Sequence, residues 1–376
     1  MSGVQELTRD LVAIPSHTDE TAAGDHIEQW LRTETDSQVR RDSHGNVIAR
    51  KGGGDRSLAL VGHHDVVPPD SSQTDDGEYV LETRSGRLYG RGAADMKGAV
   101  AASLCAFRDC APENGELVFA SFVGEETGGE GARGAIADGF APTHAVVGEG
   151  STGYSAPGVT DVAIAHKGRR AITVDAVGTA AHASQPEAGT NAIYRATDAV
   201  DAIREFETPE TTVLGHELRG SLVVTEIDGG SAWNVVPEAC SVTVDERTVP
   251  GERAPLSALA EQPGITVSVD QDLKPMACTD DDFAALALDA ARAVHRSDSD
   301  PVEQSRSAGE TPEHVVKPHA TDAGWLADAG TACLVCGPAE PGEAHTADES
   351  VSLSVLDRCH EIYREIATRY DSTIAG

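Results

Sequence analysis

The order of strand-like and helix-like segments constrains the fold of this chain more than any other feature. Over the first 165 or so residues, apolar strand-like segments (57–67, 116–126, 143–149) alternate with segments of helical pattern (18–32, 97–109, 131–139). Apolar strands that alternate with helices are typical of a parallel sheet covered on both faces. The pattern therefore predicts an α/β fold with a mostly parallel central sheet.

The pattern changes at Lys167. The next segments read as strand (170–178), helix (191–206), two strands (221–230 and 233–249), helix (255–262) and strand (264–273). This is the split βαβ order of a ferredoxin-like α+β unit. Helix and strand patterns then resume at 282–297, 331–337 and 352–370. We therefore expect one α/β domain built from residues 1–166 and 278–376, interrupted by an inserted domain over 167–277.

Charge excludes one class of partner. The chain has 62 acidic and 29 basic residues and a net charge of −33, without the basic patch that a nucleic-acid-binding protein needs. No stretch approaches the ~20 apolar residues of a membrane span, and the N-terminus lacks a signal-peptide core. We expect a cytoplasmic protein that binds neither nucleic acid nor membranes.

Seven cysteines, an odd number scattered through the chain, do not form the pattern of a disulfide framework. Cys333 and Cys336 have the spacing of a metal or redox motif, but no second pair accompanies them. They also lie in an apolar strand-like run, so we interpret them as buried core thiols.

Polar residues follow the first predicted strand in the stretch GHHDVVP, residues 62–68. Successive side chains on a strand point to opposite faces, so His63 and Asp65 share one face and His64 looks to the other. A metal-bound histidine usually has its second ring nitrogen held by a carboxylate or a carbonyl, and Asp65 is placed to do this. A purely structural histidine at a strand end is the alternative.

Further carboxylates follow other predicted elements: Asp95 precedes a helix, Glu125 and Glu126 end a strand, and Glu149 ends another. In open α/β sheets, ligands bind at the carboxyl ends of the strands. Two adjacent carboxylates repel each other, so a nearby cation is the simplest reason for the pair; a solvated strand end is the alternative. His345 lies in a Gly/Pro-rich loop after the last strand.

Together, GHHDVVP (62–68), GRGAADMKG (90–98), the Glu125–Glu126 pair, the Gly148–Glu149 pair and AHTADE (344–349) resemble the motifs of the two-zinc amidohydrolases and exopeptidases. The resemblance covers nearly the whole chain, with the motifs in the same order. It implies a di-zinc aminopeptidase-like domain that binds two Zn²⁺ ions per subunit, with Co²⁺ or Mn²⁺ as substitutes. One ion would be bound by His63 and Glu149, the other by Glu126 and His345, and Asp95 would bridge both.

The same resemblance implies that Asp65 orients His63, that Glu125 is the general base, and that the peptide bond after Asp95 is cis. In the inserted domain it implies dimerisation or a lid, with His182 reaching across a homodimer to the oxyanion. Further matches assign substrate contacts to the following residues: Asn234, Arg247, Arg169, Arg170 and Thr321. An arginine suits a substrate carboxylate through paired hydrogen bonds.

The family acts on small N-acyl amino acids, so we expect an amide hydrolase of lysine or arginine biosynthesis. N-succinyl-diaminopimelate is the first candidate substrate. N-acetylornithine or carrier-protein-linked lysine or ornithine is the alternative, followed by a dipeptidase or carboxypeptidase activity. Ala323-Gly324-Trp325 departs from the Gly-Arg-Phe or Ala-Arg-Phe of many relatives and so lacks one expected arginine.

Two other classes of function fit the sequence less well. A binding protein that has kept the fold and lost the chemistry would not need every expected ligand and Glu125, yet all are present. A nucleotide-binding oxidoreductase needs a GxGxxG run, and the segment 124–131 lacks it.

The acidic excess and the presence of only five lysines resemble the surfaces of salt-loving archaeal proteins. Concentrated cations screen the repulsion that a charge of −33 creates. We predict that the protein loses folded structure and activity as the salt concentration falls, measured by circular dichroism and turnover in a salt titration. A protein that stays folded and active at low ionic strength would contradict this hypothesis.

Overall fold

The computed structural model describes residues 2–298 and 311–374. The chain divides into two compact units. The first contains residues 1–165, 277–317 and 321–376, and the second contains 166–276 and 318–320. These ranges differ from the expected ones by one residue at each junction. They also add the short segment 318–320 to the second unit, far along the chain from its other residues.

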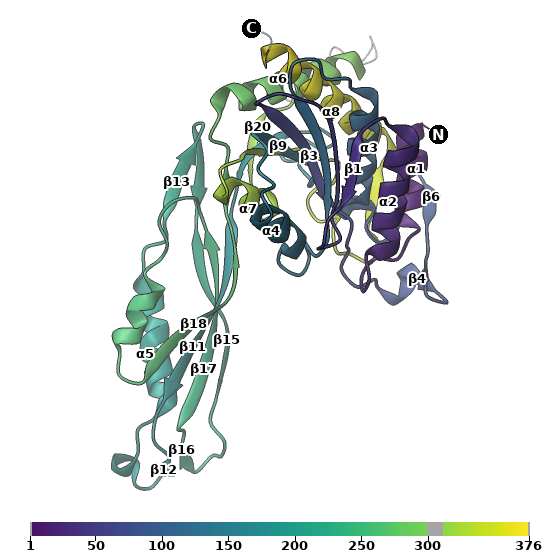
Figure 1. Cartoon of the computed structure of the whole chain (residues 1–376). Helices are drawn as coiled ribbons and strands as arrows, with labels where there is room; N and C mark the ends of the chain where they lie inside the picture. Colours follow the sequence, from purple (N-terminus) through teal and green to yellow (C-terminus); the bar gives the residue numbers. More distant parts are fainter. Residues whose placement is uncertain (1, 299–310, 375–376) are drawn as a thin grey trace. The chain divides into compact units, whose positions relative to one another are not determined.

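A nine-stranded sheet forms the centre of the first unit (Figure 1). Its order is β1 (Gln38–Arg41), β2 (Val47–Gly52), β8 (Glu116–Phe122), β3 (Ser57–His63), β9 (His144–Val147), β21 (Ala332–Val335), β10 (Val162–His166) and β19 (Met276–Ala277), with β20 (His314–Lys317) paired to β10. The four middle strands β8, β3, β9 and β21 are parallel. The pairs β1–β2, β2–β8 and β10–β21 are antiparallel. The first unit therefore has the predicted α/β fold, and its sheet has a parallel centre and antiparallel flanks.

The register of the parallel strands places their carboxyl ends at one edge. Leu60 of β3 is opposite Phe119 of β8 and Val146 of β9, and His63 is opposite Phe122. The segments that leave β3, β8 and β9 therefore emerge side by side. These are the segments that carry the predicted ligands.

Helices pack against this sheet and against one another. They are α1 (Gly3–Val12), α2 (Thr21–Glu34), α3 (Gly98–Asp109), α4 (Glu130–Ala137), α6 (Asp281–Asp298), α7 (Ala323–Asp328) and α8 (Leu353–Ile374). α3 packs against α1 and α8, α6 packs against α8, and α4 packs against α7 (Figure 1). A Cβ atom at Gly62 would lie 2.8 Å from Met96 Cε, so glycine is what lets the end of β3 approach the segment before α3.

Residues 70–87 form a polar stretch without helix or strand periodicity, yet they contain regular structure. They form η1 (Ser71–Gln73), β4 (Thr74–Asp75), β5 (Glu78–Tyr79), β6 (Glu82–Arg84) and the start of β7 (Arg87–Tyr89). β7 pairs with β22 (Ser350–Ser352) near the far end of the chain. Strands of two or three residues are too short to show periodicity, so the sequence pattern did not reveal them.

The second unit has the predicted split βαβ topology. Its main elements are β11 (Gly168–Val177), α5 (Ala192–Glu205), β15 (Ser221–Gly229), β17 (Ala239–Thr248), η4 (Leu256–Glu261) and β18 (Ile265–Leu273). The antiparallel sheet has the order β15-β17-β11-β18. Smaller elements are β12 (Ala181–His182), η3 (Pro186–Ala188), β13 (Glu210–Val213), β14 (His216–Arg219) and β16 (Val235–Val236). The helix expected over 255–262 is a short 3₁₀ helix, because Pro255 and Pro263 leave room for only about two turns.

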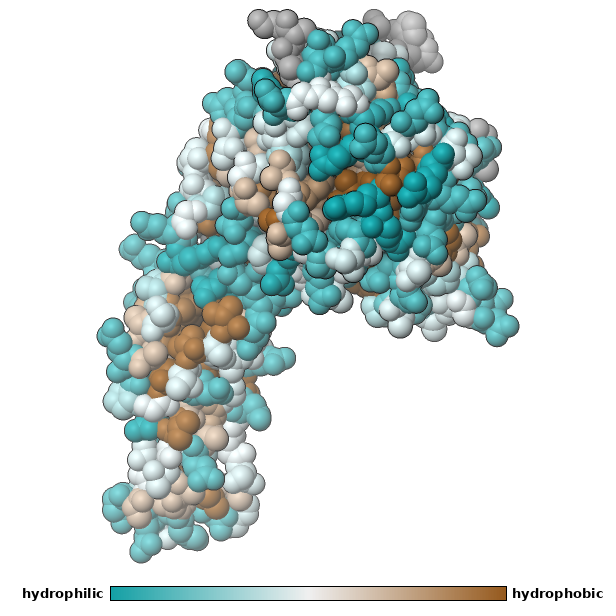
Figure 2. All heavy atoms as spheres, in the orientation of Figure 1, coloured by the Kyte–Doolittle hydropathy of each residue, from teal (hydrophilic) through white to brown (hydrophobic). Residues whose placement is uncertain are grey.

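Most of the visible surface is hydrophilic, and apolar side chains gather on the second unit (Figure 2). Among the described residues, seven large apolar side chains are exposed, and six of them belong to this unit. They are Val177, Tyr194, Val223, Ile227, Trp233 and Val269. Most of the exposed large apolar side chains of the described residues thus lie on the second unit.

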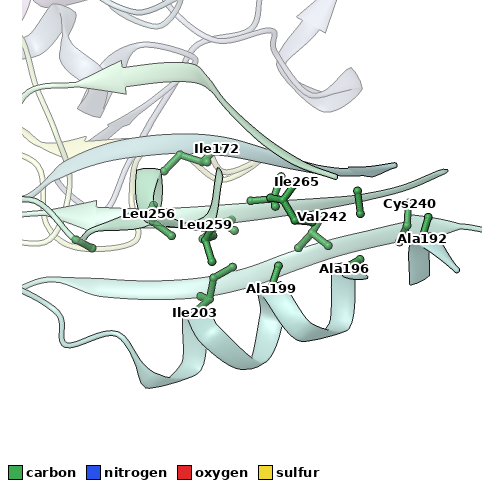
Figure 3. Close-up of a cluster of buried hydrophobic side chains, with 14 residues drawn as sticks. Ile172, Ala192, Ala196, Ala199, Ile203, Cys240, Val242, Leu256, Leu259 and Ile265 are labelled. Atoms are coloured by element: carbon green, nitrogen blue, oxygen red, sulfur yellow. The ribbon is translucent and has the colours of Figure 1, made fainter. Parts of the chain in front are cut away.

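A compact core lies between α5 and one face of the second sheet (Figure 3). Ala192, Ala196, Ala199 and Ile203 recur at helical spacing and are buried against the strands. Small alanine side chains let the helix lie close to the sheet. Because this core contains only residues of the second unit, the unit has the hydrophobic centre of an independent domain.

Cys333 lies on β21 and Cys336 directly after it, and both are buried free thiols. Burial raises the pKa of each thiol well above its usual value. The interpretation as core cysteines is confirmed. Among the described residues, the structure contains no helix that combines the length and apolar character of a membrane span.

Candidate metal centre

His63 is the last residue of β3, so the strand ends four residues earlier than the sequence pattern indicated. Its side chain is 2% exposed. The ring atom Nε2 lies 3.1 Å from Asp95 Oδ1 and 3.4 Å from Glu149 Oε1. His63 therefore points one ring nitrogen at two carboxylates from different parts of the chain.

Asp65 holds the other side of the same ring. His63 Nδ1 lies 3.1 Å from the backbone oxygen of Asp65 and 3.3 Å from its carboxylate Oδ1. Only the backbone contact has hydrogen-bond geometry, and we take the carboxylate as a charge partner, since Oδ1 has no hydrogen bond among the described residues. Asp65 Oδ2 accepts a hydrogen bond of 3.0 Å from the backbone N–H of Glu126. Asp65 thus links His63 to the turn that carries Glu125 and Glu126.

His64 lies apart from the carboxylates and is fully buried. Its Nδ1 is 2.8 Å from Ser121 Oγ on β8. Burial lowers the pKa of His64 to about 3, so the ring is neutral at ordinary pH. The two histidines therefore point in different directions, as strand alternation predicted.

Asp95 lies in η2 (Ala93–Lys97), a short irregular turn before α3. Its backbone dihedral angles are not helical, and the peptide bond to Met96 is cis, as the resemblance implied. Oδ1 faces His63, while Oδ2 lies 3.1 Å from Nε2 of His345. One carboxylate thus faces two histidines from opposite ends of the chain.

Glu125 and Glu126 follow β8 in a tight turn closed by hydrogen bonds from the Gly129 N–H to the oxygens of Gly124 and Glu125. Glu126 Oε1 lies 3.0 Å from His345 Nε2. Burial raises the pKa of Glu125 well above its usual range, and the negative charge of Asp322 acts in the same direction. The two adjacent glutamates therefore occupy different environments.

His345 completes the cluster from a turn near the C-terminus. It has a positive φ of 62°, uncommon for a residue with a side chain, and its side chain is half exposed. Hydrogen bonds to Asp95 and Glu126 raise the pKa of His345 to about 10. The carboxylates around it strongly stabilise positive charge at this point.

The cluster forms two groups that share Asp95. One group is His63, Asp95 and Glu149, and the other is Asp95, Glu126 and His345; within each group the donor atoms lie within 4.8 Å of one another. Three mutually repelling carboxylates and two histidines, without a thiol, form a donor set that suits divalent zinc, cobalt or manganese. The residues therefore fit a pair of cations with a common carboxylate.

The second unit brings His182 and Asn234 together. β12 pairs with β16, His182 is opposite Val235, and the Ala183 N–H donates to the backbone oxygen of Asn234 at 2.9 Å. His182 is exposed, with Nδ1 2.7 Å from Ser184 Oγ. Its ring is therefore available to a ligand from outside the unit.

The predicted substrate arginines lie on the four-stranded sheet, apart from the β12–β16 pair. Arg169 and Arg247 are opposite each other on β11 and β17, and both bind Asp245, at 2.9 and 2.7 Å. Arg170 points to the other face and binds the buried carboxylate of Glu246 at 2.9 Å. Eight residues of β11 separate Arg169 from Val177, near the β12–β16 end, which corresponds to about 26 Å. The second unit thus divides its candidates between one end of the four-stranded sheet and the β12–β16 pair near the other end.

Thr321 is buried and lies two residues before α7, where its Oγ1 accepts a hydrogen bond of 3.2 Å from the Ala323 N–H. The neighbouring Asp322 was not assigned a role from the sequence. Both of its carboxylate oxygens are buried and have no hydrogen-bond partner among the described residues, and burial raises its pKa to about 7. Burial thus favours the neutral form of this acid.

Two buried lysines lie near the candidate ligands, and the sequence analysis did not single them out. Lys97, two residues after Asp95, donates to the Ile14 oxygen at 2.6 Å, and burial lowers its pKa to about 7. Lys317 donates to the oxygen of Gly150, next to Glu149. Only five lysines occur in the chain, so the scarcity of this residue was a signal that could have drawn attention to both.

The chain is similar in sequence and in fold to known proteins. The chain is 32% identical to acetylornithine deacetylase of Myxococcus xanthus over 338 residues, 84% of this chain and 82% of that protein. It is 28% identical to succinyl-diaminopimelate desuccinylase of Xylella fastidiosa (strain M12), over 98% and 99% of the two chains. The crystal structure of the YxeP protein of Bacillus subtilis, described as a dinuclear metal-binding peptidase, has a similar fold, with a TM-score of 0.67, 15% identity and coverage of 98% of both chains. The model of peptidase family M20/M25/M40 matches residues 59–369, and the chain belongs to this family.

Proposed function

We propose that this protein is a metal-dependent hydrolase that cleaves the amide bond of an N-acyl amino acid. The observation that carries the proposal is the position of Asp95, which belongs to both candidate metal-binding groups. A carboxylate placed in this way can bridge two cations. The M. xanthus and X. fastidiosa relatives are both named for the removal of an acyl group from an amino acid.

In this proposal, two Zn²⁺ ions, or Co²⁺ or Mn²⁺ in their place, are held by the two groups. His63 and Glu149 bind one ion, Glu126 and His345 bind the other, and Asp95 binds both. When bound, such a pair supplies Lewis acidity for the attack of water on the amide carbonyl. Asp65 keeps the His63 ring in place through Nδ1, the usual role of a group behind a metal-binding histidine.

Glu125 is the general base in this proposal. It is next to Glu126 but belongs to neither group of donor atoms, so its carboxylate stays available for proton transfer. It takes a proton from the attacking water and gives it to the departing amine. Burial, which raises the pKa of this carboxyl, favours its protonated form and so suits the second of these transfers.

N-succinyl-diaminopimelate is the first candidate substrate, and N-acetylornithine is the second. A carrier-linked lysine or ornithine follows, then a dipeptide. The relatives named above represent the first two activities at similar identity and so favour neither. Gly324, at the position where many relatives have an arginine, weakens the case for a second carboxylate on the acyl group. The ring of the next residue, Trp325, packs against the Arg133 guanidinium at 5.1 Å.

We also propose a homodimer formed through the second unit. Arg169 and Arg247 lie at one end of the four-stranded sheet, and the β12–β16 pair with His182 and Asn234 lies near the other end, which is about 26 Å away along β11. A substrate of amino-acid size cannot contact both ends of one sheet. Contributions from two copies of the chain to each site remove this difficulty, with His182 acting on the site of the partner. The exposed apolar residues of this unit are consistent with a covered face.

The function is tested by turnover of the metal-loaded protein with N-succinyl-diaminopimelate, N-acetylornithine and simple N-acyl amino acids. We expect one of the first two to be hydrolysed with the highest kcat/KM. Chelation should abolish this turnover, and Zn²⁺ or Co²⁺ should restore it. Full activity in the presence of the chelator would refute the proposal.

Replacing the two adjacent glutamates separately tests their roles. Glu125→Ala should bind metal as the wild type does and lose about 10²–10⁴-fold in kcat, because proton transfer is removed. Glu126→Ala is the matched control and should lose metal, measured by elemental analysis. Loss of metal in Glu125→Ala, with retention in Glu126→Ala, would mean that the two roles are exchanged.

A mixing experiment tests the action of His182 across a dimer. His182→Ala and Glu125→Ala should each form folded dimers with very low turnover. After subunit exchange, a mixed dimer has one site with an intact Glu125 and an intact His182 from the partner chain, so activity should return. If the mixture stays as inactive as its components, His182 acts within its own chain or not at all.

A further inference from the structure

Arg91 and Glu349 form a buried ion pair next to the candidate metal centre. Arg91 Nη1 lies 2.5 Å from Glu349 Oε2, and the two side chains are 4% and 1% exposed. Neither residue belongs to the two groups of donor atoms. A buried pair of this kind is costly to maintain for stability alone, so its position requires an explanation.

The second oxygen of Glu349 binds the turn that carries Asp95. Oε1 accepts hydrogen bonds from the backbone N–H groups of Ala94, at 3.0 Å, and of Asp95, at 3.2 Å. These N–H groups lie at the start of a helical segment, where no backbone acceptor precedes them. Glu349 satisfies both from a distant part of the chain, as a capping residue does locally.

Glu349 also fixes the segment that carries His345. It lies four residues after His345 and directly before β22, which pairs with β7. Its backbone oxygen accepts a hydrogen bond of 3.1 Å from the Gly90 N–H. One residue therefore connects two ligand-bearing segments that are about 250 residues apart in the sequence.

We propose that the Arg91–Glu349 pair is a positioning device for the metal centre. Arg91 orients the Glu349 carboxylate, which holds the backbone of Asp95 so that its side chain reaches both groups of ligands. Because Asp95 is common to both groups, the device acts on both metal ions. This inference rests on the proposed metal-dependent function.

A simpler reading is that Glu349 only adds negative charge near the cations. The two readings predict opposite effects for Arg91. If charge alone matters, removal of the Arg91 cation strengthens metal binding; if positioning matters, removal leaves Glu349 without its partner and weakens it.

The test measures Zn²⁺ affinity of the metal-stripped full-length protein by competition with a chelator. Circular dichroism of the metal-free protein reports folding, and the absorption of the Co²⁺-substituted protein reports coordination. Glu349→Ala should weaken both ions by about 10–100-fold and change the Co²⁺ spectrum. Arg91→Met should weaken binding in the same direction, and Arg91→Lys should restore most of it.

Arg87→Met is the matched control. Arg87 pairs with Glu343 and donates to Ser350 Oγ at 3.0 Å, so it ties the same two segments together without contacting the Asp95 turn. Its metal affinity should stay close to that of the wild type. An equal loss in Arg87→Met would overturn the proposal, because tethering alone would then explain the effect.

Unchanged affinity in Glu349→Ala, or tighter binding in Arg91→Met, would also overturn it. If Glu349→Ala does not fold, Glu349→Gln keeps an oxygen for the two N–H groups and loses the ion pair; it should show a smaller loss, and unchanged affinity would again contradict the proposal. Failure of the wild type to bind metal would refute the metal-dependent function itself. A wild type that binds two ions with variants that match it would refute only the positioning role.

Discussion

Mutual repulsion among the carboxylates of Asp95, Glu126 and Glu149 is the constraint around which the first unit is organised. Each side chain is only 13–15% exposed, so water can screen their charges only partly. Two histidine rings stand between them, within 3.0–3.4 Å. Such an arrangement favours positive charge at two points, which is the physical basis for the proposed pair of metal ions.

The residues behind the ligands show how the chain holds such a cluster together. The backbone oxygen of Asp65 contacts the His63 ring, and its carboxylate accepts a hydrogen bond from the N–H of Glu126. The carboxylate of Glu349 accepts a hydrogen bond from the N–H of Asp95, and its backbone oxygen accepts one from Gly90, which fixes the segment that carries His345. Each supporting carboxylate joins two ligand-bearing segments, so no ligand depends only on its own loop.

The second unit has a different organisation, because its candidate residues lie in two places, at one end of the four-stranded sheet and on the β12–β16 pair near the other end. The pairs His182–Asn234 and Arg169–Arg247 are each well formed locally. Since strand length sets their separation, one copy of the unit cannot place both at a single small substrate. This separation is the strongest structural reason to propose that two chains build each site.

Much of this could be predicted from local patterns. Strand and helix periodicity was enough to predict an interrupted α/β domain, and side-chain alternation was enough to separate His63 from His64, because both depend on residues close in the sequence. The assignment of the ligands came from the resemblance of the motifs to the family. The short strands β4 to β7 were missed, since they carry no periodicity. The link from Asp65 to Glu126, the Arg91–Glu349 pair and the unpaired Asp322 were missed for another reason: each depends on partners far along the chain or on burial. The sequence by itself therefore determined the elements and the candidate ligands, whereas the tertiary structure alone decided which carboxylates meet, since their distances and burial arise only when remote segments pack together.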